Sequence, residues 1–183
     1  MINKLMTILA EARAVLERVD ESDVNETAAL LAGAPRIFVV GEGRSGLMAK
    51  SFAMRLMHLG ATSYVIGETI TPSIAEGDYV VAVSGSGTTH SVVWTAEKAR
   101  ELGASVIALT TDVESPLARS AVRVLAIPAA TKHRREGESA SIQPLGSLFD
   151  QCVHLVLDAV CLCYAESRGV DNAAAFKQHS NVE

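Results

Sequence analysis

Apolar residues recur at helical spacing near the start of the chain and then gather into short β-branched runs. The spacing from Leu5 to Val19 predicts an amphipathic helix over about residues 2–19, and a second helix is expected from Val24 to Leu31. Runs that are apolar along their whole length are typical of parallel strands buried on both faces. Five such runs follow, separated by segments of helical length, at 36–40, 62–66, 78–83, 105–109 and 122–127.

This alternation predicts an α/β fold with a doubly wound five-stranded parallel sheet, N-terminal helices and a long C-terminal helix. One domain over residues 1–183 is expected, because a chain of this length can bury roughly 70% of its unfolded surface. The expected long helix runs from about Ser147 to Glu166. The expected segments are N-terminal helices (1–35), an α/β core (36–128), a mobile loop (129–144), and a C-terminal helix and tail (145–183).

The loop at 129–144, AATKHRREGESASIQP, is charged and rich in small residues. Its basic run, residues 132–135, has two interpretations. It could close over a phosphorylated ligand, or it could be simply solvated, which is the commoner case for basic runs in surface loops. The sequence alone assigns it no chemistry.

The composition favours a small-molecule partner over nucleic acid. Lys and Arg number 16 against 21 Asp and Glu, for a net charge of −5, so there is no basic excess to neutralise a phosphate backbone. Aromatic residues make up 4% of the chain, too few for the stacking platforms of single-stranded nucleic-acid binders. The three cysteines, Cys152, Cys161 and Cys163, fall in one apolar stretch, which suits reduced thiols in a cytosolic core.

No membrane or export signal is evident in the sequence. The first 21 residues lack the cleavage site of a signal peptide, and the most apolar segment, 152–163, is too short and too polar to span a bilayer. A cytoplasmic protein without membrane or nucleic-acid partners is therefore expected.

Two glycine-rich loops follow predicted strands and open predicted helices. The first, GEGRSG at 41–46, directs backbone N–H groups and a positive helix terminus at one point, which favours an anion. Gly41, Gly43 and Gly46 also match G-x-G-x-x-G, and Glu68 follows the second strand where a dinucleotide-binding acid would lie, so NAD binding is an alternative. Such a turn can also be a plain helix cap.

The second loop, SGSGTT, decides between these interpretations. It follows the third strand and combines hydroxyl side chains with glycines that let the backbone approach a phosphate closely. If the strand order is 2-1-3-4-5, both loops flank the topological switch point and form one pocket. A chain this short leaves no room for a catalytic domain after a dinucleotide fold, which disfavours NAD. The loop consists of Ser84, Gly85, Ser86, Gly87, Thr88 and Thr89.

Four stretches, GEGRSGLMAKSFAMRLMHLG, VIGETITPSIAEGDYVVAVSGSGTT, SIQPLGSLFDQ and QHSNVE, together resemble the 6-phospho-3-hexuloisomerases of the sugar-isomerase (SIS) superfamily. The resemblance covers nearly the whole chain. It implies the flavodoxin-like SIS fold, a homotetramer, and a phosphorylated ketohexose as substrate. The implied reaction interconverts 3-hexulose 6-phosphate and fructose 6-phosphate, in formaldehyde fixation by the ribulose monophosphate route or in its reverse.

That reaction needs a base for the C2 proton of the 3-ketose and stabilisation of an enediolate. The five histidines are scattered without a paired ligand motif, so neither a metal nor a cofactor is expected. The alternative to an isomerase is a sugar-phosphate-binding regulator or an inactive homologue. Regulators of this superfamily usually carry an N-terminal helix-turn-helix module, for which roughly 35 residues before the first strand are too few.

The resemblance also implies roles for individual residues. Arg44 is a candidate for orienting or neutralising the enediolate, or is a surface arginine beside a turn. Glu68 could bind sugar hydroxyls, cap a helix or pair with a neighbouring arginine. Phosphate and substrate contacts are implied for Ser45, Ser84, Ser86, Thr88 and Thr89.

Asp150 stands where the family has a glutamate that accepts the proton, so the resemblance implies a catalytic base on a shorter side chain. Ser147 and Asp150 also have the spacing of a capping box, which is the structural alternative. His58 lies about 20 Å from the phosphate-binding end of its own helix, so it is expected at a neighbouring subunit's site or in an intersubunit hydrogen bond. His179 has the same two interpretations, with a frayed tail as a third.

Overall fold

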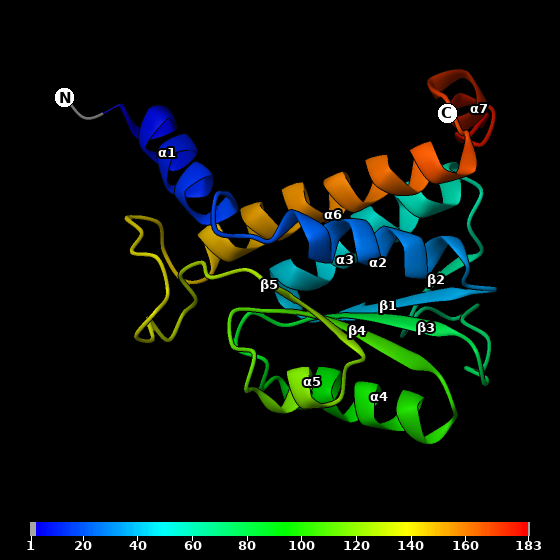
Figure 1. Cartoon of the computed structure of the whole chain (residues 1–183), viewed down its shortest axis with the longest axis horizontal. Helices are drawn as coiled ribbons and strands as arrows, with labels where there is room; N and C mark the ends of the chain where they lie inside the picture. Colours follow the sequence, from blue (N-terminus) through cyan, green and yellow to red (C-terminus); the bar gives the residue numbers. More distant parts are fainter. Residues whose placement is uncertain (1–2, 183) are drawn as a thin grey trace.

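The computed structural model describes residues 3–182, which form a parallel sheet between two layers of helices (Figure 1). The strands are ordered β2-β1-β3-β4-β5, and each pairs in parallel with its neighbours. The predicted fold class and the strand order are confirmed. The strands are β1 (Ile37–Gly41), β2 (Ser63–Val65), β3 (Tyr79–Val83), β4 (Ser105–Thr110) and β5 (Arg123–Ala126).

The helices divide between the two faces of the sheet (Figure 1). α2, α3 and α6 cover one face, α4 and α5 cover the other, and α1 packs on α6. The second helix begins earlier than predicted because the Asp20 carboxylate caps it, accepting a hydrogen bond from the Ser22 amide. The helices are α1 (Lys4–Leu16), α2 (Glu21–Ala32), α3 (Gly43–His58), α4 (His90–Glu101), α5 (Pro116–Arg119), α6 (Ser147–Arg168) and α7 (Asn172–Phe176).

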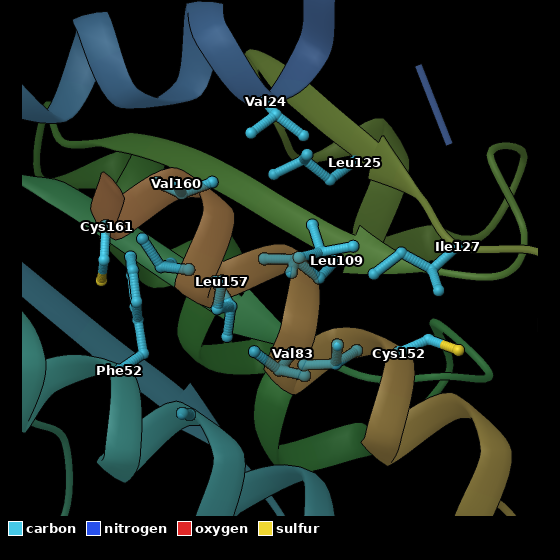
Figure 2. Packing of buried hydrophobic residues seen from close by; sticks show 14 of the residues in the cluster. Val24, Phe52, Val83, Leu109, Leu125, Ile127, Cys152, Leu157, Val160 and Cys161 are labelled. Carbon is cyan, nitrogen blue, oxygen red and sulfur yellow. The ribbon is translucent and has the colours of Figure 1, made fainter. Parts of the chain in front are cut away.

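The core consists of two apolar clusters, one on each face of the sheet, because successive strand residues point to opposite faces. In the larger cluster, Leu157 and Val160 of α6 pack with Val83 and Leu109 of the sheet (Figure 2). By length and composition α6 could cross a membrane, but 56% of its apolar window is buried inside the molecule. α6 is therefore the central helix of the core. Burial of a residue such as Leu157 contributes roughly 1.5–3 kcal/mol.

The segment 129–144 contains neither helix nor strand, as predicted, and its mobility stays a prediction. Hydrogen bonds tie it to itself and to its surroundings. The Glu138 carboxylate accepts from the Thr131 amide at 2.8 Å and the Thr131 hydroxyl at 2.7 Å. Arg134 has a φ of +49° and Leu145, just beyond the segment, has a φ of +53°, so the backbone bends sharply at both places.

Candidate active site

The two glycine loops lie side by side because β1 and β3 are neighbours in the sheet. α3 leaves β1 toward one face and α4 follows β3 on the other, so the loops flank the topological switch point (Figure 1). Between them is a cavity of about 420 Å³. It is lined by Glu42, Gly43, Arg44, Ser45, Gly85, Ser86, Thr89, Thr131, Lys132, His133, Leu145, Gly146, Phe149 and Asp150.

The first loop is shaped by close contact between strand and helix. A Cβ atom added to Gly46 would lie 2.6 Å from the Gly41 carbonyl oxygen, closer than real Cβ contacts allow. Gly43 has a φ of +57°, which favours glycine. This tight turn places Arg44 and Ser45 in the first turn of α3, facing the cavity.

Asp150 provides a buried carboxylate at the cavity wall, in the first turn of α6, and only 5% of its surface is exposed. Its Oδ1 accepts a hydrogen bond from the Ser45 hydroxyl at 2.8 Å, and its Oδ2 accepts one from Arg44 Nε at 3.0 Å. The carboxylate is thus held from both sides by α3. Arg44 is ion-paired, although 63% of its side chain is exposed.

The capping-box interpretation of Ser147 and Asp150 is wrong. Gly146 is the N-cap of α6, and no side chain makes a cap hydrogen bond there. The physical reason is that Ser45 and Arg44 engage both oxygens of Asp150. Asp150 therefore lies at the cavity wall, paired with α3, and does not cap its own helix.

The second loop divides into residues that line the cavity and residues that hold its shape. Gly85, Ser86 and Thr89 line the cavity. Ser84 is buried, and its hydroxyl lies 2.9 Å from the Thr89 hydroxyl. The Thr88 hydroxyl donates to Ser86 Oγ at 3.0 Å.

Gly87 is required by the packing behind the loop. Its φ is +63°, and an added Cβ would lie 2.1 Å from the Ser115 hydroxyl oxygen. A side chain there would collide with Ser115 at the start of α5 and with Thr110 at the end of β4. The second loop therefore needs glycine both for its turn and for its support.

Several residues at the cavity were not assigned from the sequence. Lys132 and His133 belong to the basic run of 129–144, and the structure favours its ligand-facing interpretation, because both line the cavity. Glu42 lies within the first loop, and its carboxylate accepts a hydrogen bond from the Ser91 hydroxyl at 2.8 Å, which joins the first loop to the start of α4. The basic run was the one sequence signal that pointed to this wall of the cavity.

Glu68 does not reach this cavity within the chain, contrary to the expectation that it binds sugar hydroxyls there. It follows β2, which is the edge strand on the far side of β1 from β3. Its carboxylate lies 3.9 Å from Lys50 Nζ, and about half of its side chain is exposed. The partner is a lysine rather than the arginine considered from the sequence.

His58 and His179 come together at the opposite end of α3 from the cavity. Their rings are stacked, with centroids 5.3 Å apart. His58 is buried, and no described residue makes a hydrogen bond with its Nδ1. Burial lowers the pKa of His58, and the nearby Arg55 and His179 lower it further. Because the ring of His179 stacks on that of His58, the frayed-tail interpretation of His179 is not favoured.

A doubly wound sheet with two glycine loops at its switch point defines the class of SIS-domain phosphosugar proteins, and the family described as SIS domain matches residues 30–155. The chain is 42% identical over 176 residues to the 3-hexulose-6-phosphate isomerase of Bacillus subtilis (strain 168), covering 96% of this chain and 95% of the relative. It is 41% identical over 181 residues to that of Mycobacterium gastri, covering 99% and 90%. The chain belongs to the SIS-domain family and, within it, to the family of 3-hexulose-6-phosphate isomerases, so the resemblance seen in the sequence is confirmed.

A solved structure supports the same family. It is a hypothetical protein from Methanococcus jannaschii, whose crystal structure "infers a molecular function of 3-hexulose-6-phosphate isomerase". It matches this chain with a TM-score of 0.85 at 28% identity, over 100% of both chains.

Proposed function

We propose that this protein is an isomerase that interconverts 3-hexulose 6-phosphate and fructose 6-phosphate. The observation that carries the proposal is the buried Asp150 carboxylate, held by Ser45 and Arg44 across one cavity from the second glycine loop. The loop suits the phosphate group of a substrate, and the carboxylate suits the proton transfer that moves a carbonyl group by one carbon. The regulatory alternative is not favoured, because relatives that are named isomerases cover nearly the whole chain.

The second glycine loop binds the substrate phosphate in this proposal. Ser86 and Thr89 line the cavity with hydroxyl groups. The loop leads into the N-terminus of α4, whose backbone dipole favours an anion. A phosphate at the loop leaves the sugar chain extending toward Asp150, because both line the same cavity.

Asp150 is the base that moves the proton. In the direction toward fructose 6-phosphate it takes the proton from C2 of the 3-ketose, and the electrons of that C–H bond form the C2–C3 double bond of an enediolate. The electrons of the C3 carbonyl move to its oxygen, O3. The hydroxyl proton then passes from O2 to O3, and return of the proton from Asp150 to C3, with a carbonyl group forming at C2, completes the reaction. Arg44 stands beside the carboxylate, where its positive charge stabilises the negative charge of the enediolate.

A direct assay tests this proposal. The purified protein is expected to convert 3-hexulose 6-phosphate into fructose 6-phosphate, followed by coupled reduction of a nicotinamide cofactor downstream of fructose 6-phosphate. Chelation with EDTA is expected to leave the rate unchanged, since the proposed steps use Asp150 as the base and Arg44 as the stabilising charge. Failure of the wild-type protein to convert the substrate would overturn the proposal.

We further propose a homotetramer in which His58 and His179 lie at or beside a neighbouring subunit's site. Two features support it. His58 Nδ1 is buried without a partner among residues 3–182, which is costly unless another group completes it. Leu5 and Leu9 on α1 are 79% and 59% exposed beside an apolar groove of about 530 Å³. Light scattering is expected to give four chains, and a fully active monomer would remove both histidines from the mechanism.

The setting of the reaction follows from its substrate. We propose that the protein acts in the cytoplasm, in formaldehyde fixation by the ribulose monophosphate route or in its reverse. Burial raises the pKa of Cys152 to about 11 and that of Cys161 to about 12, so both thiols stay protonated at neutral pH, which suits the reduced thiols of a cytoplasmic protein.

A further inference from the structure

Residues at the end of β4 hold the second glycine loop by hydrogen bonds to one of its backbone carbonyl groups. The Gly85 carbonyl oxygen accepts three hydrogen bonds from two consecutive residues. The Thr111 amide donates at 3.0 Å, the Thr111 hydroxyl at 2.8 Å and the Thr110 hydroxyl at 3.2 Å. Thr111 does not itself line the cavity.

The direction of this carbonyl fixes the direction of the next N–H group. In a trans peptide the C=O and N–H bonds point to opposite sides. Because the Gly85 carbonyl is held against the end of β4, the N–H group of Ser86 points away from β4. Gly85 and Ser86 both line the cavity, so we infer that this N–H group faces it. No described residue accepts a hydrogen bond from the Ser86 amide.

The segment 129–144 also holds the second glycine loop by a hydrogen bond. Arg135 Nη1 donates to the Ser86 carbonyl oxygen at 3.1 Å and lies 3.2 Å from the Asp112 carboxylate. The Thr111 hydroxyl also lies 3.5 Å from the Glu138 carboxylate, which holds Thr131 at the cavity wall. Donors outside the loop thus hold the carbonyl groups of both Gly85 and Ser86.

We propose that Thr111 is a positioning residue for the substrate phosphate. Its hydroxyl holds the Gly85 carbonyl so that the Ser86 amide is aimed at a phosphate oxygen before the substrate arrives. The benefit is preorganisation, because a donor already aimed at the anion needs no reorientation on binding. The inference rests on the proposed function, since it concerns the phosphate of that substrate.

Two variants of the full-length protein test it. Thr111→Val keeps the shape of the side chain but loses the hydroxyl, and Thr111→Ser keeps the hydroxyl. We expect Thr111→Val to raise the KM for fructose 6-phosphate about tenfold and kcat to stay within about threefold, the scale of one lost hydrogen bond. The inhibition constant of inorganic phosphate is expected to rise by the same factor. Thr111→Ser is expected to stay within about twofold of wild type.

A wild-type KM and phosphate inhibition constant in Thr111→Val would overturn the inference. So would a fall in kcat with unchanged phosphate inhibition, because that pattern belongs to a general structural role. A wild-type protein that isomerises nothing would instead overturn the proposed function.

A second measurement needs no variant. In amide NMR of the wild-type protein, inorganic phosphate is expected to shift the Ser86 N–H resonance downfield, as a new hydrogen bond to an anion does. The Gly87 amide, which already donates to the Ser84 carbonyl at 3.0 Å, serves as the internal control and is expected to move less. A Ser86 resonance that does not respond to saturating phosphate would contradict the inference.

Discussion

The two ends of α3 differ in how completely the chain satisfies its own polar groups. At the N-terminal end, both oxygens of Asp150 have partners from α3 itself. At the C-terminal end, His58 is as deeply buried as Asp150, yet its Nδ1 has no partner among residues 3–182. Buried polar groups in folded proteins are nearly always paired. The comparison teaches that residues of one chain pair both oxygens of Asp150, whereas they leave a buried nitrogen of His58 unpaired, which is why a neighbouring subunit is proposed at the histidine end.

The largest expected effect comes from removing the charge of Asp150, which lies at the N-terminal end of α3. Asp150→Asn is expected to lower kcat about 100-fold or more with little change in KM, because a general base is lost while the phosphate contacts remain. Asp150→Glu is expected to keep activity. Asp158→Asn, in the same helix but outside the cavity, is the matched control in the same steady-state assay. Equal kcat values for the Asp150→Asn and Asp158→Asn variants would count against the base.

The next effect concerns the tight backbone turn between β1 and α3. Gly46→Ala is expected to destabilise the protein by about 1–3 kcal/mol, because its Cβ would collide with the Gly41 carbonyl. Gly33→Ala is the control, since an added Cβ there meets nothing closer than 3.7 Å and its φ is −89°. Urea midpoints of the two variants give the comparison. A Gly46→Ala protein as stable as Gly33→Ala would show that the close approach is not needed.

The smallest effect concerns pH at the histidine end. The pKa of His58 is lowered in the folded chain, so the unfolded state binds a proton that the folded state does not as pH falls through about 6.5. Stability is therefore expected to fall as pH drops below that value, until the folded pKa is passed. His58→Gln is expected to weaken this dependence, and the more exposed His154 is the control through His154→Gln.

Melting temperatures at pH 7.5 and 5.5 measure this effect. If the wild type and His58→Gln lost stability equally over that interval, another group would be responsible.

The fold and the position of the cavity could be predicted because their signals are local. The apolar runs mark the strands, and each glycine loop directly follows one of them. The strand order then brings the two loops together. The partnership of Asp150 with Ser45 and Arg44 was not visible, because it joins residues more than 100 positions apart.

The remaining features depend on packing that the sequence does not display. Lys132 and His133 lie in a segment without periodicity, so only the folded chain shows that they line the cavity. The sequence left three interpretations of Glu68 open, and only the folded chain shows that its strand lies at the edge of the sheet and that it lies beside Lys50. The stacking of His179 on His58 requires α7 and the turn after it, which no apolar pattern predicted.

The central claim is that Asp150 moves the proton, and hydrogen exchange tests it most directly. Fructose 6-phosphate is incubated with the protein in deuterated water, and loss of its C3 proton signal is followed by NMR. The wild type is expected to exchange this proton. Asp150→Asn is expected to exchange it at a rate at least about 100-fold lower. Undiminished exchange in Asp150→Asn would contradict the account and would pass the base to another group, with His58 of a neighbouring subunit the first candidate.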